Sequence, residues 1–234
     1  MKKLFTICIL LYSIVLWGQD NTAKLFETTL IKADIDTLVS KLKEYHPTFF
    51  VHYQESNMQN KIDSIKKTIK YPISSLDFFR IMQPIVAIDG HTTLNYTGQI
   101  PPKCNNPFFP FKIIIHKDNL YIKENLSGKN DISKGSIIES INGVPVNRII
   151  ANLIRYLPGE KTAYKTKSLE NEFHIYYRLV YGSDSLFNIT VNESEVMVKG
   201  AKWNDFKEPM RPKFLIELKI SPIFRFRSKR ISNG

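Results

Sequence analysis

The spacing of hydrophobic residues changes once along this chain, from a helical period before about residue 96 to a strand-like period after about residue 107. The first part contains three runs in which apolar residues recur every three or four positions, which marks one buried face of a helix. These runs cover residues 31–45, 58–69 and 76–86. Helices followed by short strands predict an α+β protein with an N-terminal helical block and a β-rich module.

Prolines and capping residues set the ends of the predicted helices. Pro47 and Pro72 end the first two, because proline disfavours helical geometry in the residue before it. Ser74 or Ser75 is expected to cap the third helix through its hydroxyl group. Residues 91–96 then have the character of a short strand.

The second part predicts hairpins and two helices. Residues 111–116 and 120–123 are strand-like runs on either side of a turn. Asn142-Gly143 is a second turn signal, and Asn147 is expected to cap a helix. The remaining elements expected are a strand at 137–141, a helix carrying residues 169–180, and a hairpin formed by 186–191 and 195–198.

The N-terminus has the layout of a secretory signal peptide. Lys2 and Lys3 precede an apolar run from Leu4 to Trp17, and small Gly18 follows. The run is short for a membrane span, although an uncleaved anchor is the alternative. We therefore expect export to the periplasm or cell surface, with transient membrane association only through residues 1–19.

The positive charge is concentrated in the last part of the chain. The formal net charge is +11, and residues 199–234 hold ten basic and three acidic residues, a surplus of seven. The body at 20–198 is close to neutral, which argues against a specific nucleic-acid partner.

Two cysteines exclude a disulfide framework and a cysteine zinc cluster, and no phosphate-binding glycine loop is present, so no metal and no cofactor is expected.

Three strings occur in an order that identifies a family resemblance. They are Tyr45-His46-Pro47, then Ile88-Asp89-Gly90-His91-Thr92, then a Gly-Ser-Ile-Ile-x-Ser-Ile-Asn-Gly string that begins at Gly135. In this order they resemble the front half of a secreted serine peptidase of the tail-specific (C-terminal-processing) family, in the branch similar to the tricorn protease core. The resemblance covers about residues 28–200.

The resemblance implies a catalytic role for His91. The family's histidine at the matching position is the general base for a serine nucleophile, and imidazole titrates near neutral pH. Asp89 would orient His91, or would instead cap a turn. Without the resemblance, His91 is an ordinary half-exposed residue at the start of a strand.

The chain departs from the family at the nucleophile. A full member continues into an Asp-x-Arg-x-Asn-x-Gly-Gly stretch and then the catalytic serine, and neither is found in these 234 residues. We therefore expect a peptidase cut short before its nucleophile, with little or no turnover, since a base without a nucleophile forms no acyl-enzyme.

The string at Gly135 is typical of PDZ-like modules, which bind an extended peptide by adding it to a sheet edge. In this interpretation Lys134, Gly135, Ser136 and Ile137 form the loop that holds the terminal carboxylate of a peptide or protein. Alternatively, Gly135 starts a strand and Asn142-Gly143 only turns a hairpin.

Four segments result: a signal peptide at 1–19, a helical block at 20–106, a PDZ-like module at 107–198 and a basic, incomplete tail at 199–234. The tail has strand character near 214–220 and no completed element after Pro222. The expected function is that of a serine-type peptidase homologue. A non-catalytic exported PDZ-like adaptor is the alternative, and a tail that binds anionic lipid or nucleic acid is a third.

Overall fold

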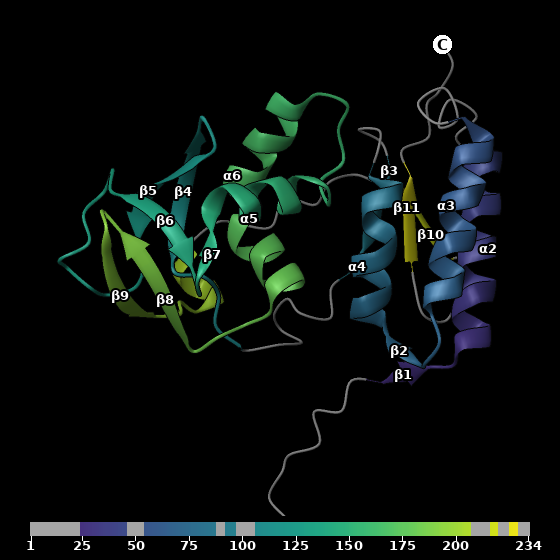
Figure 1. The fold of residues 1–234 in the computed structure, drawn as a ribbon, viewed down its shortest axis with the longest axis horizontal. Coiled ribbons are helices and arrows are strands. Elements are labelled where there is room, and N and C mark those ends of the chain that lie inside the picture. The colour runs from purple at the N-terminus through teal and green to yellow at the C-terminus, as the bar shows by residue number, and fades with distance from the viewer. Residues whose placement is uncertain are drawn as a thin grey trace, which may run out of the picture.

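The computed structural model of the protein describes residues 24–45, 54–87, 92–96, 106–206, 216–219 and 225–228. The described residues form two groups of elements that lie side by side (Figure 1). One group contains the N-terminal helices, and the other contains an antiparallel sheet with two helices. The predicted α+β class is confirmed.

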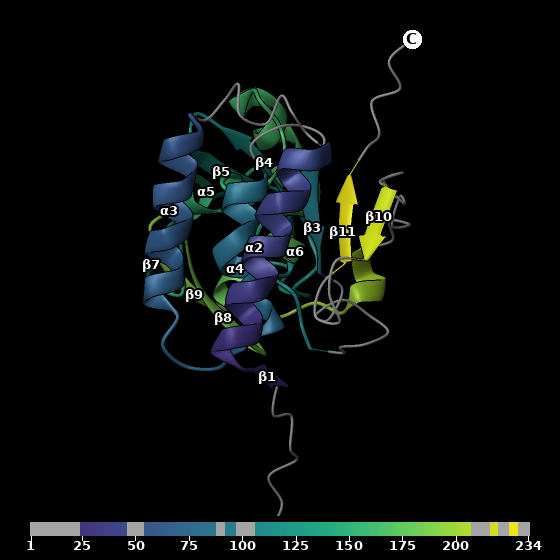
Figure 2. The same ribbon diagram turned by 90° about the vertical axis from the view of Figure 1, so that its right-hand side faces the viewer.

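The N-terminal group is built on three helices, each matching a predicted run. They are α2 (Thr28–Tyr45), α3 (Glu55–Thr68) and α4 (Ser75–Val86). Figure 2 shows the three helices packed beside one another. The apolar face of each helix is buried in a shared core. Short strands β1 (Leu25–Phe26) and β2 (Ile73–Ser74) pair antiparallel at one end.

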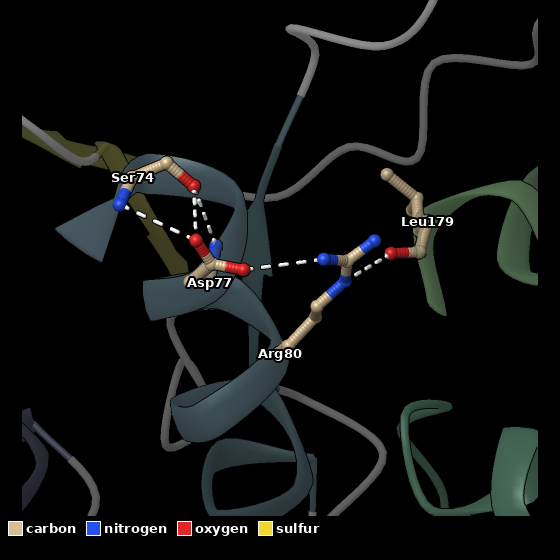
Figure 3. Close-up of polar contacts among 4 residues, drawn as sticks. All are labelled: Ser74, Asp77, Arg80 and Leu179. Carbon is tan, nitrogen blue, oxygen red and sulfur yellow. Dashed lines mark hydrogen bonds and ion pairs between the residues drawn. The ribbon is translucent and has the colours of Figure 1, made fainter. Parts of the chain in front are cut away.

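Helix α4 begins at a complete capping box, drawn in Figure 3. The Ser74 hydroxyl accepts a hydrogen bond from the Asp77 amide at 3.1 Å. The Asp77 carboxylate in turn accepts from the Ser74 amide at 3.4 Å and from the Ser74 hydroxyl at 2.6 Å. Of the two serines predicted as caps, Ser74 is therefore the capping residue.

A small sheet links the end of the helical block to the end of the chain. Strand β3 (Thr92–Asn95) pairs antiparallel with β11 (Arg225–Ser228), which pairs with β10 (Ile216–Lys219). The predicted strand near 214–220 is thus present as β10. The prediction of no element after Pro222 was wrong, because the partner of β11 lies far earlier in the sequence and leaves no local signal there.

The second group is a six-stranded antiparallel sheet with helices. Along the sheet the order is β4-β5-β6-β8-β9, and β7 pairs with β6. The strands are β4 (Phe111–His116), β5 (Asn119–Asn125), β6 (Ile137–Ile141), β7 (Val144–Pro145), β8 (Leu186–Val191) and β9 (Ser194–Lys199). Helices α5 (Val146–Ile154) and α6 (Thr162–Tyr181) pack on it, and a 3-10 turn, η2 (Trp203–Phe206), follows β9.

Helix α5 begins two residues earlier than a cap at Asn147 requires. Pro145 is the N-cap residue and Val146 is the first helical residue. The Asn142-Gly143 turn folds Pro145 back against Ser140 of β6, so the helix has to start directly after this pairing. The Asn147 side-chain oxygen Oδ1 instead accepts a hydrogen bond from the Arg148 amide at 2.8 Å, so the predicted cap was wrong.

The two groups are joined by polar contacts as well as by packing. Arg80 of α4 donates from Nε to the Leu179 carbonyl of α6 at 2.7 Å and from Nη1 to Asp77 at 3.1 Å (Figure 3). Lys165 of α6 donates to the Ala87 carbonyl at 3.0 Å. Leu179 is itself buried in the core of the helical block, so α6 belongs to both groups.

Candidate functional site

The two predicted catalytic residues, Asp89 and His91, lie outside the described residues. Their neighbours in the chain are described: α4 ends at Val86, and β3 begins at Thr92, directly after His91. The predicted roles of Asp89 and His91 therefore stay predictions, while the elements on either side of them can be examined.

Gln83 holds these two elements together. Its side chain is 0% exposed. Its Oε1 accepts from the Leu94 amide of β3 at 2.7 Å, and its Nε2 donates to Thr93 Oγ1 at 2.9 Å. The same Nε2 donates to the Tyr156 carbonyl of the second group at 2.7 Å. One side chain thus ties α4, β3 and the sheet module together beside the segment that carries His91.

Sequence analysis did not single out Gln83. The only available signal was a polar residue next to the apolar face of a helix, between Met82 and Ile85. Such a residue commonly faces solvent, and its partners lie on β3 and after α5, which the helical pattern cannot indicate.

The predicted carboxylate loop, Lys134–Ile137, is described in full, and three of its amides donate hydrogen bonds within the protein. The Gly135 amide donates to the Ile122 carbonyl at 2.8 Å, and the Ser136 amide donates to the Ser133 carbonyl at 3.2 Å. Gly135 has φ +87°, a conformation that favours glycine and turns its amide toward β5. Lys134 is exposed on this turn.

The third amide of the loop, that of Ile137, is also engaged, since it donates to Asn192 Oδ1 at 3.2 Å. Moreover, the strand that Ile137 begins, β6, lies between β5 and β8. An extended peptide can add only to an unpaired strand edge. Three amides of the loop are thus used within the protein and β6 is not an edge strand. The prediction that Lys134–Ile137 hold a terminal carboxylate stays a prediction.

One edge of the sheet is formed by β9 and the other by β4, which pairs with β5 only. Helix α6 lies along this edge, and Glu170 Oε1 accepts a hydrogen bond from the Ile115 amide at 2.9 Å. A shallow, open depression lies between strand and helix. It is lined by Phe111, Lys112, Ile113, Lys123, Glu170, Asn171, Phe173, His174 and Phe206. We call it the β4–α6 groove.

The groove carries charged side chains at its rim. Lys112 forms an ion pair with Glu124 at 3.0 Å across the β4–β5 pair. Lys123 is exposed beside it. On the opposite wall Glu170 is paired with Lys167 one turn earlier in α6. The strand side of the groove is therefore positively charged, and the helix side presents a carboxylate that already bonds the strand.

His174 lies at one end of the groove and is 8% exposed. Its ring stacks on Phe206 with centroids 3.9 Å apart and an interplanar angle of 11°. Phe108 approaches edge-on at 5.7 Å. Burial, with a smaller contribution from the nearby Lys112 ammonium, lowers the pKa of His174 from its ordinary value of 6.5 to about 3. His174 is consequently a neutral imidazole at physiological pH.

The low pKa of His174 predicts a loss of stability in mild acid. Between pH 6.5 and 3 the unfolded chain binds a proton that the folded protein does not, so the free energy of unfolding falls as the pH falls. The slope from this group is about 1.4 kcal/mol per pH unit, which amounts to about 2 kcal/mol between pH 6.5 and 5. His174→Phe is expected to remove that loss, measured by urea unfolding at pH 7.5 and 5.

The same substitution at His116, which is exposed on β4, controls for the loss of a histidine as such. An equal pH dependence in the His174→Phe variant and the unsubstituted protein would contradict the burial of a neutral imidazole at this position.

In the described ranges no three His, Cys, Asp or Glu side chains come together as a group able to hold a metal ion. None of the helices in these ranges is both long and apolar enough to cross a bilayer.

Comparison with known proteins shows a similarity of fold. No protein-family model matches the chain, and no curated protein matches it. A crystal structure of a mutant of CPAF, a chlamydial serine protease, matches with a TM-score of 0.53 and 14% identity. The match covers 75% of this chain and 34% of the CPAF chain. The structure of mature CPAF complexed with lactacystin matches with a TM-score of 0.49 and 14% identity, over 74% of this chain and 35% of the other.

This chain therefore spans about a third of the CPAF chains that it matches. At 14% identity the similarity establishes a shared fold over that part.

Proposed function

We propose that this chain is a serine-type peptidase homologue that corresponds to the front part of a tail-specific-like protease. Its role is to hold an extended polypeptide and to contribute His91 as general base. The best support is the fold similarity to CPAF over 75% of the chain. The order of the sequence motifs resembles that of a peptidase family, and the fold similarity agrees with this resemblance.

The proposed base acts from the segment between α4 and β3. His91 precedes β3 directly, and Gln83 fixes the β3 backbone through the Leu94 amide at 2.7 Å. Since Gln83 also bonds the Tyr156 carbonyl, the position of β3 is tied to the module that would hold the polypeptide. In a complete active site, His91 would take the hydroxyl proton of the catalytic serine.

The polypeptide is proposed to bind in the β4–α6 groove as a further antiparallel strand on β4. No described strand pairs with the outer edge of β4, and α6 forms the opposite wall of the groove. PDZ-like modules likewise bind peptides between a strand edge and a helix. Lys112 and Lys123 give the strand side a positive charge that suits a free terminal carboxylate. This placement replaces the one at Lys134–Ile137.

A non-catalytic adaptor remains the second candidate, and one observation favours it. The same groove serves peptide binding without chemistry, and the sequence holds no Asp-x-Arg-x-Asn-x-Gly-Gly stretch. In either case we place the protein outside the cytoplasm, on the basis of the signal-peptide pattern at residues 1–19.

Peptide titration with charge-reversed variants tests the proposed groove. Extended peptides with a free carboxylate are expected to bind, and the same peptides with an amidated end are expected to bind more weakly. Lys123→Glu should weaken binding about threefold to tenfold, because a partly exposed charge contributes about 1 kcal/mol. Lys134→Glu is the matched control and should leave the affinity within a factor of about two.

Loss of binding in Lys134→Glu alone would contradict the β4–α6 placement and restore the loop placement. A peptide-hydrolysis assay on the same samples separates the two candidates. Neither predicts turnover by the 234-residue chain alone, so hydrolysis that survives His91→Ala would contradict the proposed role of His91.

A further inference from the structure

We propose that the η2 turn, Trp203–Phe206, is an internal occupant of one end of the β4–α6 groove, and that a peptide whose C-terminal residue is aromatic displaces it. This inference rests on the proposed peptide-binding function and deepens it, since it names the side-chain class that the groove accepts and a contact that competes for the same place.

A pair of backbone hydrogen bonds and a close backbone approach place η2 next to the start of β4. Ala201 exchanges two hydrogen bonds with Phe108, at 2.9 and 3.0 Å, just before β4 begins. Gly200 lies so near Pro107 that a Cβ on Gly200 would stand 2.5 Å from the proline Cβ. The end of β9 is thereby held against the residues that lead into β4, and η2 follows at once.

Phe206 fills the end of the groove with an aromatic ring. It is buried, lines the groove, and stacks on His174 at 3.9 Å. Phe108 meets the Phe206 ring edge-on at 6.0 Å. Trp203 lies beside the same rings, 5.5 Å from Phe108 and 6.0 Å from His174. The site that η2 occupies is therefore built for a flat aromatic ring between two others.

The occupant is separable from the main core of the module. Phe206 belongs to a small cluster with Phe108 and Ala201, apart from the large cluster under the sheet. The η2 turn itself is held by local bonds, in which the Lys202 amide donates to Asp205 Oδ2 at 2.7 Å and the Asp205 amide donates to the Lys202 carbonyl at 3.1 Å. A small satellite cluster opens at lower cost than the core beside it.

The chemistry of the displaced contact indicates the ligand class. A peptide that runs along β4 with its last residue at Phe108 and His174 would place its terminal side chain where Phe206 now lies. A phenyl or indole ring reproduces the stacking on the neutral His174 imidazole, and a charged side chain does not. The preferred occupant is therefore a polypeptide that ends in phenylalanine, tyrosine or tryptophan.

The first test removes the internal ring. If the groove end is closed in about nine molecules of ten, Phe206→Ala should raise the apparent affinity for a Phe-terminated peptide about tenfold. Asn204→Ala, at an exposed position of the same turn, is the matched control and should change the affinity less than about twofold. A peptide of the same sequence that ends in aspartate should show no gain.

The second test reports displacement without altering η2. In a Trp17→Phe background, Trp203 is the only tryptophan of the chain. Saturating Phe-terminated peptide should increase the quenching of Trp203 fluorescence by acrylamide, because the half-buried ring becomes more exposed. An Asp-terminated peptide should not.

The outcomes separate this inference from the proposed function. Peptide binding with unchanged affinity in Phe206→Ala and unchanged Trp203 quenching would overturn the displacement of η2 and leave the groove intact as a peptide site. If neither the unsubstituted protein nor the Phe206→Ala variant binds the peptide while both are folded, the proposed function and this inference are both overturned.

Discussion

Replacement of Gln83 by leucine is expected to lower the free energy of unfolding by about 3 to 4 kcal/mol, because it leaves buried polar groups without hydrogen-bond partners. The leucine fills a similar volume but neither donates nor accepts. The Leu94 amide and the Tyr156 carbonyl, which bond Gln83 at 2.7 Å each, would remain buried without this partner. Urea unfolding at pH 7.5 measures the change.

Gln59→Leu provides the control, since Gln59 is exposed on α3 and bonds only Asp63 at 3.0 Å among the bonds described. That change is expected to cost less than about 0.5 kcal/mol. A loss below about 1 kcal/mol for Gln83→Leu would contradict a central role of Gln83 in holding β3.

The substitution Phe109→Ala is expected to cost about 3 to 5 kcal/mol, the range for deletion of a buried aromatic ring. Phe109 is fully buried between the bridge at Phe108 and the first strand of the groove. Its ring lies 5.4 to 5.6 Å from four other aromatic rings, those of Phe111, Phe173, Tyr177 and Phe187.

Thermal unfolding monitored by circular dichroism gives the magnitude. Leu186→Ala, at a largely exposed position on β8, is the control and should change the stability by less than about 0.5 kcal/mol. If Phe109→Ala lowered the stability as little as Leu186→Ala, the packing of β4 against α6, and hence the groove between them, would not be as described.

The helical block was predictable because its signals are local. Apolar residues such as Ile31 and Leu42 fall on one helical face and are buried as the pattern predicts. Ser74 and Asp77 form a capping box within four residues of chain. Hairpin turns at Lys117-Asp118 and Asn142-Gly143 adopt the positive φ angles that such turns need.

What the sequence did not indicate depends on partners far apart in the chain. The strand β11 becomes visible only through its pairing with β3. The three bonds of Gln83 reach β3 and Tyr156, and no periodic pattern reports them. Asn147 carried a valid local capping signal, but the β6–β7 pairing moved the start of the helix to Val146.

The site at Lys134–Ile137 shows the same limit in functional terms. The glycine turn at Gly135 is real, with φ +87°. A turn signal does not reveal, however, which strands of a sheet are left at its edges, and β6 lies between two strands, whereas β4 and β9 are the edge strands. His174 was set aside for lack of a partner in sequence, because its partner Phe206 is supplied by a turn that follows the whole module.

Mapping of peptide contacts by nuclear magnetic resonance tests the central claim most directly. A peptide with a free aromatic C-terminus would be titrated into ¹⁵N-labelled protein, and the shifts of backbone amide signals followed residue by residue. Binding in the β4–α6 groove predicts the largest shifts at residues 111–116 and 170–174, with 134–137 unaffected. Shifts confined to 134–137, or none at any peptide concentration, would contradict it.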